Sequence, residues 1–249
     1  MEKQPILIVG AMNSEIDYLI NKIEECKVTE KIGYKFFEGF IKSYPVVLVK
    51  TNIGLVNAAT ATTLAIEKYN PVFILNEGTA GGITENRHKK DIIIGNEVFN
   101  INSYKTPYKE LGEGSNSCDW ELMMFTDGKL DEKTIFKSDE RLANLAYSLS
   151  KEYKHGNVYM GVIGSGDVWN REKDKLKFLD EVHNVSCEDM EAIAIYTVAK
   201  SYKIPVLSIK IMSDNELLGE EYEPKVGLYV QEFCYKVINK MIENIWKEM

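Results

Sequence analysis

Short runs of consecutive apolar residues alternate along this chain with longer segments in which apolar residues recur every three or four positions. Such runs are typical of strands buried on both faces, and the longer spacing is typical of helices. Buried strands are predicted at Pro5–Val9, Val72–Leu75, Asp91–Ile101, Asn157–Ser165 and Pro205–Met212, with a hairpin of Tyr34–Ile41 and Val46–Lys50. Strands and helices that alternate in this way indicate an α/β domain.

The helical segments lie between these strands. The first predicted helix begins at a cap of Asn13 or Ser14 and ends near Cys26, and another begins at a cap of Ser138 and ends near Lys151. Three more are predicted over Gly54–Tyr69, Arg171–Glu181 and Val226–Met249. Residues 102–137 fit neither pattern, because glycines and scattered aromatic residues interrupt any period. A segment of that length without regular structure is unusual unless it is functional or contains short strands.

One further helix is predicted within the segment SCEDMEAIAIYTVAK, residues 186–200, where apolar residues recur at helical spacing from Met190 onward. Glu188, Asp189 and Glu191 stand at the start of this otherwise apolar helix. Acids in that place commonly cap a helix and complement its dipole. The alternative is that Glu191 faces a polar ligand, since a carboxylate beside an apolar helix requires a partner. The sequence leaves both interpretations open.

The composition narrows the class of protein. A length of 249 residues, with 45% hydrophobic and 27% charged residues, suits one globular domain over residues 1–249. The net charge of -8 argues against a nucleic-acid surface. The chain has no signal-peptide pattern and no apolar stretch of about 18 residues, which predicts a cytoplasmic protein without membrane contact. Its four scattered cysteines form no CxxC pair, so we expect reduced thiols, no metal site and no cofactor.

Polar residues gather where the predicted strands end. Ligands of open α/β sheets bind at the carboxyl ends of the strands, so four such ends are candidates. They are Gly10 to Glu15, Gly78–Gly82, Ser165–Asp167 and Ser213–Asp214. Three of them also have a plain structural interpretation: a complement to a helix dipole for Glu15, a tight turn for the glycines and an Asx turn for Ser213–Asp214. Trp169 suits either core packing or stacking on a ligand.

The order and spacing of these motifs resemble a known family. The motifs are GAMNSE (Gly10–Glu15), NEGTAGG (Asn76–Gly82), SGDVWN (Ser165–Asn170), EDMEA (Glu188–Ala192) and MSD (Met212–Asp214). They look like the successive motifs of the 5′-methylthioadenosine/S-adenosylhomocysteine nucleosidases, which belong to the purine nucleoside phosphorylase superfamily. The resemblance extends to the last helix and is weakest at residues 102–137. It implies a single three-layer αβα domain with a central mixed β-sheet, nucleoside phosphorylase-like in fold.

The resemblance also implies roles for particular residues in cleaving the bond between adenine and ribose. Asp214 would donate a proton to the leaving adenine, Glu15 would activate the attacking water, and Glu191 would accept hydrogen bonds from the ribose hydroxyls. Burial or neighbouring acids must then raise the pKa of Asp214. Several acids suit the cationic, oxocarbenium-like transition state of this reaction. The remaining implied substrate contacts are Met190, Trp169, Asn170, Thr79 and Ser213.

Water is the expected nucleophile, because phosphorylases of this superfamily bind phosphate through arginines, one of them in the first strand-end loop. Here that loop ends in Glu15, and no arginine precedes Arg87. A carboxylate at the phosphate position would repel the anion. A phosphorylase of the same fold and a catalytically inactive nucleoside-binding protein are the two alternatives. The resemblance also implies a homodimer.

Three departures from the family pattern concern the substrate. Lys210 stands where the family has an arginine four residues before the acid, and it lacks the fork geometry of a guanidinium. Trp169-Asn170 replaces a Phe-Ile pair whose backbone reads the adenine edge in the family, so the base stays open. Residues 102–137 correspond to the part that reaches the 5′ end of a neighbouring subunit's substrate. The 5′ substituent therefore stays open between methylthio, homocysteinyl and others such as futalosine-type nucleosides.

Overall fold

The first apolar run forms β1 (Ile6–Gly10), which pairs in parallel with β4 (Tyr44–Lys50) and β5 (Phe73–Gly82). The computed structural model, which describes residues 3–126, 129–131 and 135–248, places its side chains in two cores. Ile6 and Ile8 lie in one core, and Leu7 and Val9 lie in the other. Successive strand residues point to opposite faces, so burial on both faces accounts for the uninterrupted apolar run.

The main sheet is mixed. From one edge its order is β2 (Glu24–Lys31), β3 (Tyr34–Ile41), β4, β1, β5, β13 (Val185–Asp189), β12 (Val158–Ser165), β6 (Ile92–Asn100) and β11 (Ile135–Lys137). β14 (Val206–Asn215) pairs in parallel with β5 and antiparallel with β6, which closes β5, β13, β12, β6 and β14 into a ring. The carboxyl ends of the parallel strands β1, β5 and β14 consequently meet on one side of the sheet.

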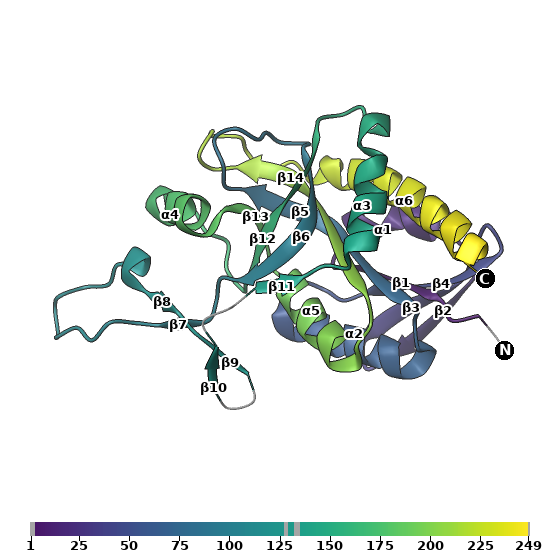
Figure 1. Ribbon diagram of the computed structural model, residues 1–249, viewed down its shortest axis with the longest axis horizontal. Coiled ribbons are helices and arrows are strands. Elements are labelled where there is room, and N and C mark those ends of the chain that lie inside the picture. Colours follow the sequence, from purple (N-terminus) through teal and green to yellow (C-terminus); the bar gives the residue numbers. More distant parts are fainter. Residues whose placement is uncertain (1–2, 127–128, 132–134, 249) are drawn as a thin grey trace.

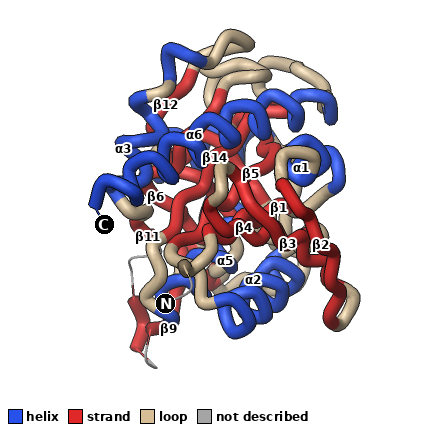
Figure 2. The backbone as a smooth tube through the Cα atoms, turned by 90° about the vertical axis from the view of Figure 1, so that its right-hand side faces the viewer, coloured by secondary structure: helices blue, strands red, loops and turns tan. Residues whose placement is uncertain are grey.

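Helices cover both faces of this sheet (Figures 1 and 2). α1 (Asn13–Ile20), α3 (Glu140–Ser148) and α6 (Gly227–Glu248) pack on one face, and α2 (Leu55–Tyr69) and α5 (Ala192–Tyr202) pack on the other. α4 (Lys173–His183) covers a smaller third core beside β12 and β13. The three-layer αβα arrangement with a central mixed sheet is therefore confirmed. Among the described residues, no helix has both the length and the apolar content that crossing a membrane requires.

The segment after β6 forms an arm that projects from the body of the protein (Figure 1). In it β7 (Tyr104–Lys105) pairs with β8 (Glu121–Leu122), and β9 (Met124–Thr126) pairs with β10 (Lys129–Asp131). A short 3-10 turn lies in the arm at Ser117–Asp119, and two others lie elsewhere in the chain, at Ser150–Glu152 and Pro224–Val226. β11 then pairs with β6 and returns the chain to the sheet. Short strands thus underlie the part of the sequence that showed no period.

Two predicted helix boundaries are wrong. α1 ends at Ile20, and Cys26 lies in β2, an edge strand that is exposed along its whole length. Its charged residues protect a sheet edge but show no apolar period. The cap of α3 is Asp139 and not Ser138, because the Asp139 carboxylate accepts hydrogen bonds from the first backbone N–H groups of the helix. Neither strand edges nor caps leave a periodic signal.

One strand was not predicted, and two others extend further into polar sequence than predicted. Ser186–Asp189 belong to the unpredicted strand β13 and not to the helix that follows. Gly78–Gly82 form no tight turn and Ser213–Asp214 form no Asx turn, because the polar ends of β5 and β14 pair with each other, with an irregularity at Ser213. A glycine is needed at residue 78, where φ is 153° and a Cβ would lie 2.8 Å from Glu15 Oε1. The pairing of β5 with β14 brings Gly78–Gly82 and Ser213–Asp214 side by side at the same end of the sheet.

Candidate active site

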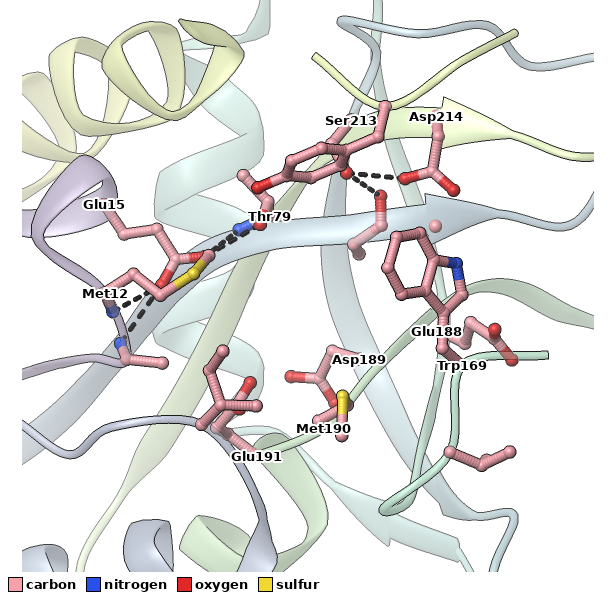
Figure 3. A pocket seen from close by; sticks show the side chains of 16 residues that line it. Met12, Glu15, Thr79, Trp169, Glu188, Asp189, Met190, Glu191, Ser213 and Asp214 are labelled. Carbon is pink, nitrogen blue, oxygen red and sulfur yellow. Dashed lines mark hydrogen bonds between the residues drawn. The ribbon is translucent and has the colours of Figure 1, made fainter. Parts of the chain in front are cut away.

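The polar ends of β1, β5, β13 and β14 surround a pocket (Figure 3). Its empty space, with open solvent at the mouth included, is about 660 Å³. Five acids line it, namely Glu15, Glu188, Asp189, Glu191 and Asp214. Of the predicted site residues, all except Asn170 line this pocket. In the part of the chain that the structure describes, no three His, Cys, Asp or Glu side chains are grouped so that they could hold a metal ion.

Glu15, in the first turn of α1, is held by four hydrogen-bond donors. Its Oε2 accepts from the backbone N–H groups of Ala11 at 3.1 Å and Met12 at 3.0 Å. Its Oε1 accepts from the backbone N–H of Thr79 at 2.7 Å and from the Thr79 hydroxyl at 2.8 Å. A carboxylate has about four lone-pair positions, and here each has a donor. Glu15 therefore does more than complement a helix dipole, because it joins α1 to β5 at the pocket.

Asp214, in β14, shares a chain of polar groups with the residue before it. The Ser213 hydroxyl donates to Asp214 Oδ1 at 2.7 Å and also lies 3.2 Å from the carbonyl oxygen of Ala80. When Asp214 carries a proton, it can donate to Ser213, and the Ser213 hydrogen can turn to Ala80. Burial raises the pKa of Asp214 above its usual value and the charge of Glu216 adds to the rise, against the Ser213 hydrogen bond and Arg171. These surroundings favour a protonated Asp214.

The acids at the start of α5 divide between the two interpretations of the sequence. Asp189 caps the helix, since the backbone N–H of Ala192 donates to its two oxygens at 3.2 and 3.1 Å. Glu191 makes no capping hydrogen bond, and its Oε1 accepts from the backbone N–H of Gly54, at the start of α2, at 2.9 Å. Burial raises the pKa of Glu191 to about 7, and the charge of Asp189 adds to the rise. Glu191 thus faces the pocket while Asp189 caps the helix.

Lys210, in β14, is enclosed behind these acids. Its Nζ pairs with Asp189 Oδ2 at 2.8 Å, and its side chain is 2% exposed. Burial by itself would lower the pKa of Lys210, but the charges of Asp189, Glu191 and Glu15 outweigh burial and raise that pKa above its usual range. The Lys210 ammonium is therefore a compact positive charge that stabilises several nearby carboxylates. The family resemblance leads one to expect the forked guanidinium of an arginine at this position.

Trp169 and Tyr222 stand at the pocket together. Their ring centroids lie 6.0 Å apart at an angle of 62°, and the residue Trp169 is 58% exposed. Core packing is therefore the wrong interpretation of Trp169. A broad indole face at the edge of a pocket provides a surface on which a flat ring can stack.

Asn170, next to Trp169, binds a protein side chain. Its backbone N–H donates to Glu188 Oε1 at 2.8 Å, and its Nδ2 donates to Glu188 Oε2 at 2.6 Å. Burial raises the pKa of Glu188 to about 7, against the two Asn170 hydrogen bonds and with support from the charges of Asp214 and Asp189. The sequence pointed to Glu188 only as an acid near a helix start. Its place in the pocket follows from the strand β13, which the periodicity did not predict.

Glu77, in β5 before Gly78, is a second acid that sequence reasoning missed. It is 1% exposed, and among the described residues neither of its carboxyl oxygens has a hydrogen-bond partner. Burial raises the pKa of Glu77 well above its usual value, and the charge of Glu15 adds to the rise while that of Lys210 opposes it. Burial without a hydrogen-bond partner therefore favours the neutral form of Glu77 more than that of a free glutamate. An acid two residues after the apolar run Val72–Leu75 was the available signal.

Comparison with known proteins assigns the family. The family model described as "Phosphorylase superfamily" matches residues 5–243. The chain belongs to the phosphorylase superfamily. One curated relative, the 5′-methylthioadenosine/S-adenosylhomocysteine nucleosidase of Bacillus cereus (strain B4264), is 28% identical over 243 residues, which are 95% of this chain and 99% of that protein.

Solved structures agree on the fold of this phosphorylase-superfamily member. The 5′-methylthioadenosine/S-adenosylhomocysteine nucleosidase of Neisseria meningitidis, in complex with methylthio-immucillin-A, has a TM-score of 0.77 at 23% identity and aligns over 95% of this chain and 99% of its own. Futalosine hydrolase of Helicobacter pylori strain 26695 has a TM-score of 0.76 at 21% identity, over 97% of this chain and 98% of its own. Both comparisons give this chain the nucleoside phosphorylase fold.

Replacement of Lys210 by methionine is expected to lower the free energy of unfolding by roughly 3–5 kcal/mol, because Asp189 would stay buried without its ion-pair partner. Replacement by arginine keeps the charge and is expected to cost less. Urea unfolding of both variants at neutral pH measures the difference. An unchanged urea midpoint for the methionine variant would mean that Lys210 does not compensate the buried acids.

Proposed function

We propose that the protein is an N-ribosyl hydrolase that cleaves a 5′-substituted adenine nucleoside, 5′-methylthioadenosine or S-adenosylhomocysteine, to adenine and the thioribose. The observation that carries this proposal is the placement of Glu15 and Asp214 toward opposite ends of one pocket, with Glu191 also facing it (Figure 3). A proton donor for the base and an activator for water must stand on different sides of the bond that breaks.

Asp214 is the proposed general acid. Its raised pKa keeps the proton available, and its contact with Ser213 allows either protonation state. After Asp214 gives its proton to a ring nitrogen of the base, the Ser213 hydroxyl can turn from Ala80 and donate to the new carboxylate. The base then leaves as a neutral molecule, which lowers the barrier to breaking the glycosidic bond.

Glu15 is the proposed activator of water. Its four lone-pair positions are occupied by three backbone N–H groups and one hydroxyl, that of Thr79. Of these donors only the hydroxyl rotates freely, so a water that binds Glu15 takes the place of the Thr79 hydroxyl. That hydroxyl then becomes free to orient the water or the sugar, in agreement with the positioning role that the resemblance implies for Thr79.

Glu191 is the proposed partner of the ribose hydroxyls. Its Oε1 accepts from the backbone N–H of Gly54, and within the described part of the chain its Oε2 accepts no hydrogen bond, which leaves it for a sugar hydroxyl. Hydroxyl donors would stabilise the ionised form of Glu191, whose pKa of about 7 without ligand leaves both forms available. Met190 lines the pocket beside it and is proposed to pack on the sugar, while Trp169 is proposed to stack on the base.

Water is favoured over phosphate as the nucleophile by the charges at this site. Among the described residues, no lysine or arginine lines the pocket, and a phosphate ion beside Glu15 would meet a carboxylate. Arg171 points its guanidinium at Glu216 and is 72% exposed at its side chain. A phosphorylase would need a cation at the place that Glu15 occupies.

Base release from 5′-methylthioadenosine and S-adenosylhomocysteine, measured without phosphate and again with it, tests the proposal. We expect adenine release in phosphate-free buffer and no increase when phosphate is added. Release that requires phosphate would make the protein a phosphorylase. Binding of both nucleosides without any release, even in single-turnover conditions, would identify a nucleoside-binding protein without activity.

A further inference from the structure

The Glu188–Asn170 pair determines which hydrogen-bonding groups the pocket offers to a base. Two donors of Asn170 clamp the two carboxyl oxygens of Glu188, at 2.8 and 2.6 Å. The clamp fixes the carboxyl group in one orientation and leaves lone pairs on both oxygens for a ligand. The backbone N–H of Asn170 is already used and is not free to donate to a base.

Glu188 lies at the end of the pocket where the base is proposed to bind. Trp169 and Asp214 lie at that same end, whereas Glu15 lies at the other (Figure 3). A Cβ on Gly81 would stand 3.4 Å from Asp214 Oδ2 and 3.6 Å from Glu188 Cγ, so the two acids flank this glycine. A purine that meets Asp214 with its imidazole nitrogen can therefore turn its six-membered ring toward Glu188.

The edge of that ring differs between the two common classes of purine. Adenine carries an acceptor at N1 and an amino donor at N6, whereas a 6-oxopurine such as hypoxanthine carries a hydrogen on N1 and an acceptor oxygen at C6. An ionised carboxylate only accepts hydrogen bonds, so one that faces N1 attracts the N1–H of a 6-oxopurine and repels the N1 lone pair of adenine, whereas one that faces the group on C6 would do the reverse. A protonated carboxyl group that faces N1 both donates and accepts, so it also pairs with the N1 of adenine.

We infer that Glu188 faces N1 in the six-membered ring of the base, so that the pocket takes 6-oxopurine nucleosides in preference to adenine nucleosides whenever Glu188 is ionised. This inference rests on the proposed nucleosidase reaction and extends its substrates to a second class of base. It assigns the selection of the base to the side chain of Glu188, whereas the family resemblance assigns that role to the backbone at residues 169 and 170. A mismatched buried hydrogen-bonding group is costly, so one residue is sufficient to choose.

The ionisation of Glu188 makes this choice depend on pH. Burial raises the pKa of Glu188 to about 7, and the groups that face it are Asn170 before α4, Asp189 in β13, Asp214 in β14 and Tyr104 in β7. The ionised fraction grows as pH rises through that pKa. The relative kcat/KM for a 6-oxopurine nucleoside should therefore increase from acid to alkaline pH. Loss of the Asp214 proton slows both substrates alike and cancels in the ratio.

The test compares two nucleosides that differ only at C6, 5′-methylthioinosine and 5′-methylthioadenosine. Between about pH 6 and about pH 8 we expect the ratio of their kcat/KM values to rise by up to about a hundredfold, the full range for one proton over two pH units. Glu188→Gln has an amide that pairs with either base, so its ratio should not change with pH. Glu188→Val frees the backbone N–H of Asn170 and should favour adenine at every pH.

Glu181→Gln, an exposed exchange of the same type on α4, is the matched control and should behave as the unchanged protein. A pH-independent preference for adenine in the unchanged protein, kept in Glu188→Val, would overturn the inference and leave the nucleosidase proposal intact. If no nucleoside is cleaved, the nucleosidase proposal fails and calorimetry with the free bases decides. Hypoxanthine should then bind better than adenine at about pH 8, and Glu188→Val should reverse that order; equal binding would refute the role of Glu188.

Discussion

Replacement of Asp214 by asparagine is expected to lower base release by about a thousandfold while nucleoside binding stays nearly unchanged. Asparagine keeps the size of the side chain and can still bond to Ser213, but it has no acidic proton for the leaving base. Single-turnover measurement of base release gives the rate, and calorimetry gives the affinity. In the unchanged protein, activity should also fall as pH rises through the raised pKa of Asp214, because only the protonated form acts as the acid.

The matched control for this exchange is Asp17→Asn, on the exposed side of α1, which should retain full activity. The Asp214 variant should lose the alkaline decline together with the rate, since the group that titrates is gone. Turnover at the unchanged rate in Asp214→Asn would remove Asp214 as the general acid. Loss of binding along with turnover would instead give it a role in holding the base.

Replacement of Glu15 by glutamine is expected to lower the rate by a hundredfold or more, about the effect of removing a general base, and to change nucleoside affinity far less. The structure adds a second consequence. Three backbone N–H groups and one hydroxyl point at the two oxygens, so an amide NH2 on either side faces donors with its own hydrogens. With the NH2 at the Oε1 position the Thr79 hydroxyl can turn and accept, so at least the hydrogen bond from the Thr79 backbone N–H is lost, which should cost about 1–3 kcal/mol of stability.

Rate and stability are measured on the same Glu15→Gln sample, with single-turnover assays and urea unfolding. Glu24→Gln, on the exposed edge strand β2, is the control that should change neither. An unchanged rate in Glu15→Gln would refute water activation by this residue. An unchanged unfolding midpoint together with a lost rate would mean that α1 and β5 do not depend on this contact.

Sequence reasoning located most of the strands and helices because burial leaves a local period. The run at Pro5–Val9 and the small-residue helix at Gly54–Tyr69 became β1 and α2 within a residue or two. β1 is buried at every residue, and α2 buries one face at helical spacing through Ala58, Ala61 and Ala65, so both burial patterns recur regularly along the sequence. The edge strand β2 and the short strand β13 were missed, because the first is exposed on both faces and the second carries polar residues into a pocket.

The candidate site shows the same division. The order of its motifs was sufficient to select Glu15, Asp214 and Glu191, because a short motif keeps its residue types together along the chain. The pairing of Glu188 with Asn170 and of Lys210 with Asp189 joins residues about 20 positions apart, through neighbouring strands and loops. Periodicity carries no information about such contacts.

The sequence by itself determined the class of fold, most of the buried strands and three of the acids that line the pocket. The tertiary structure alone decided which acid caps a helix, which one is buried without a hydrogen-bond partner, and which one Asn170 holds at the pocket. The reason is physical: burial along a strand or helix is a property of each residue in turn, whereas the protonation and pairing of a carboxyl group depend on charges and donors from every strand around it. Those neighbours are brought together only when β5, β13 and β14 pair.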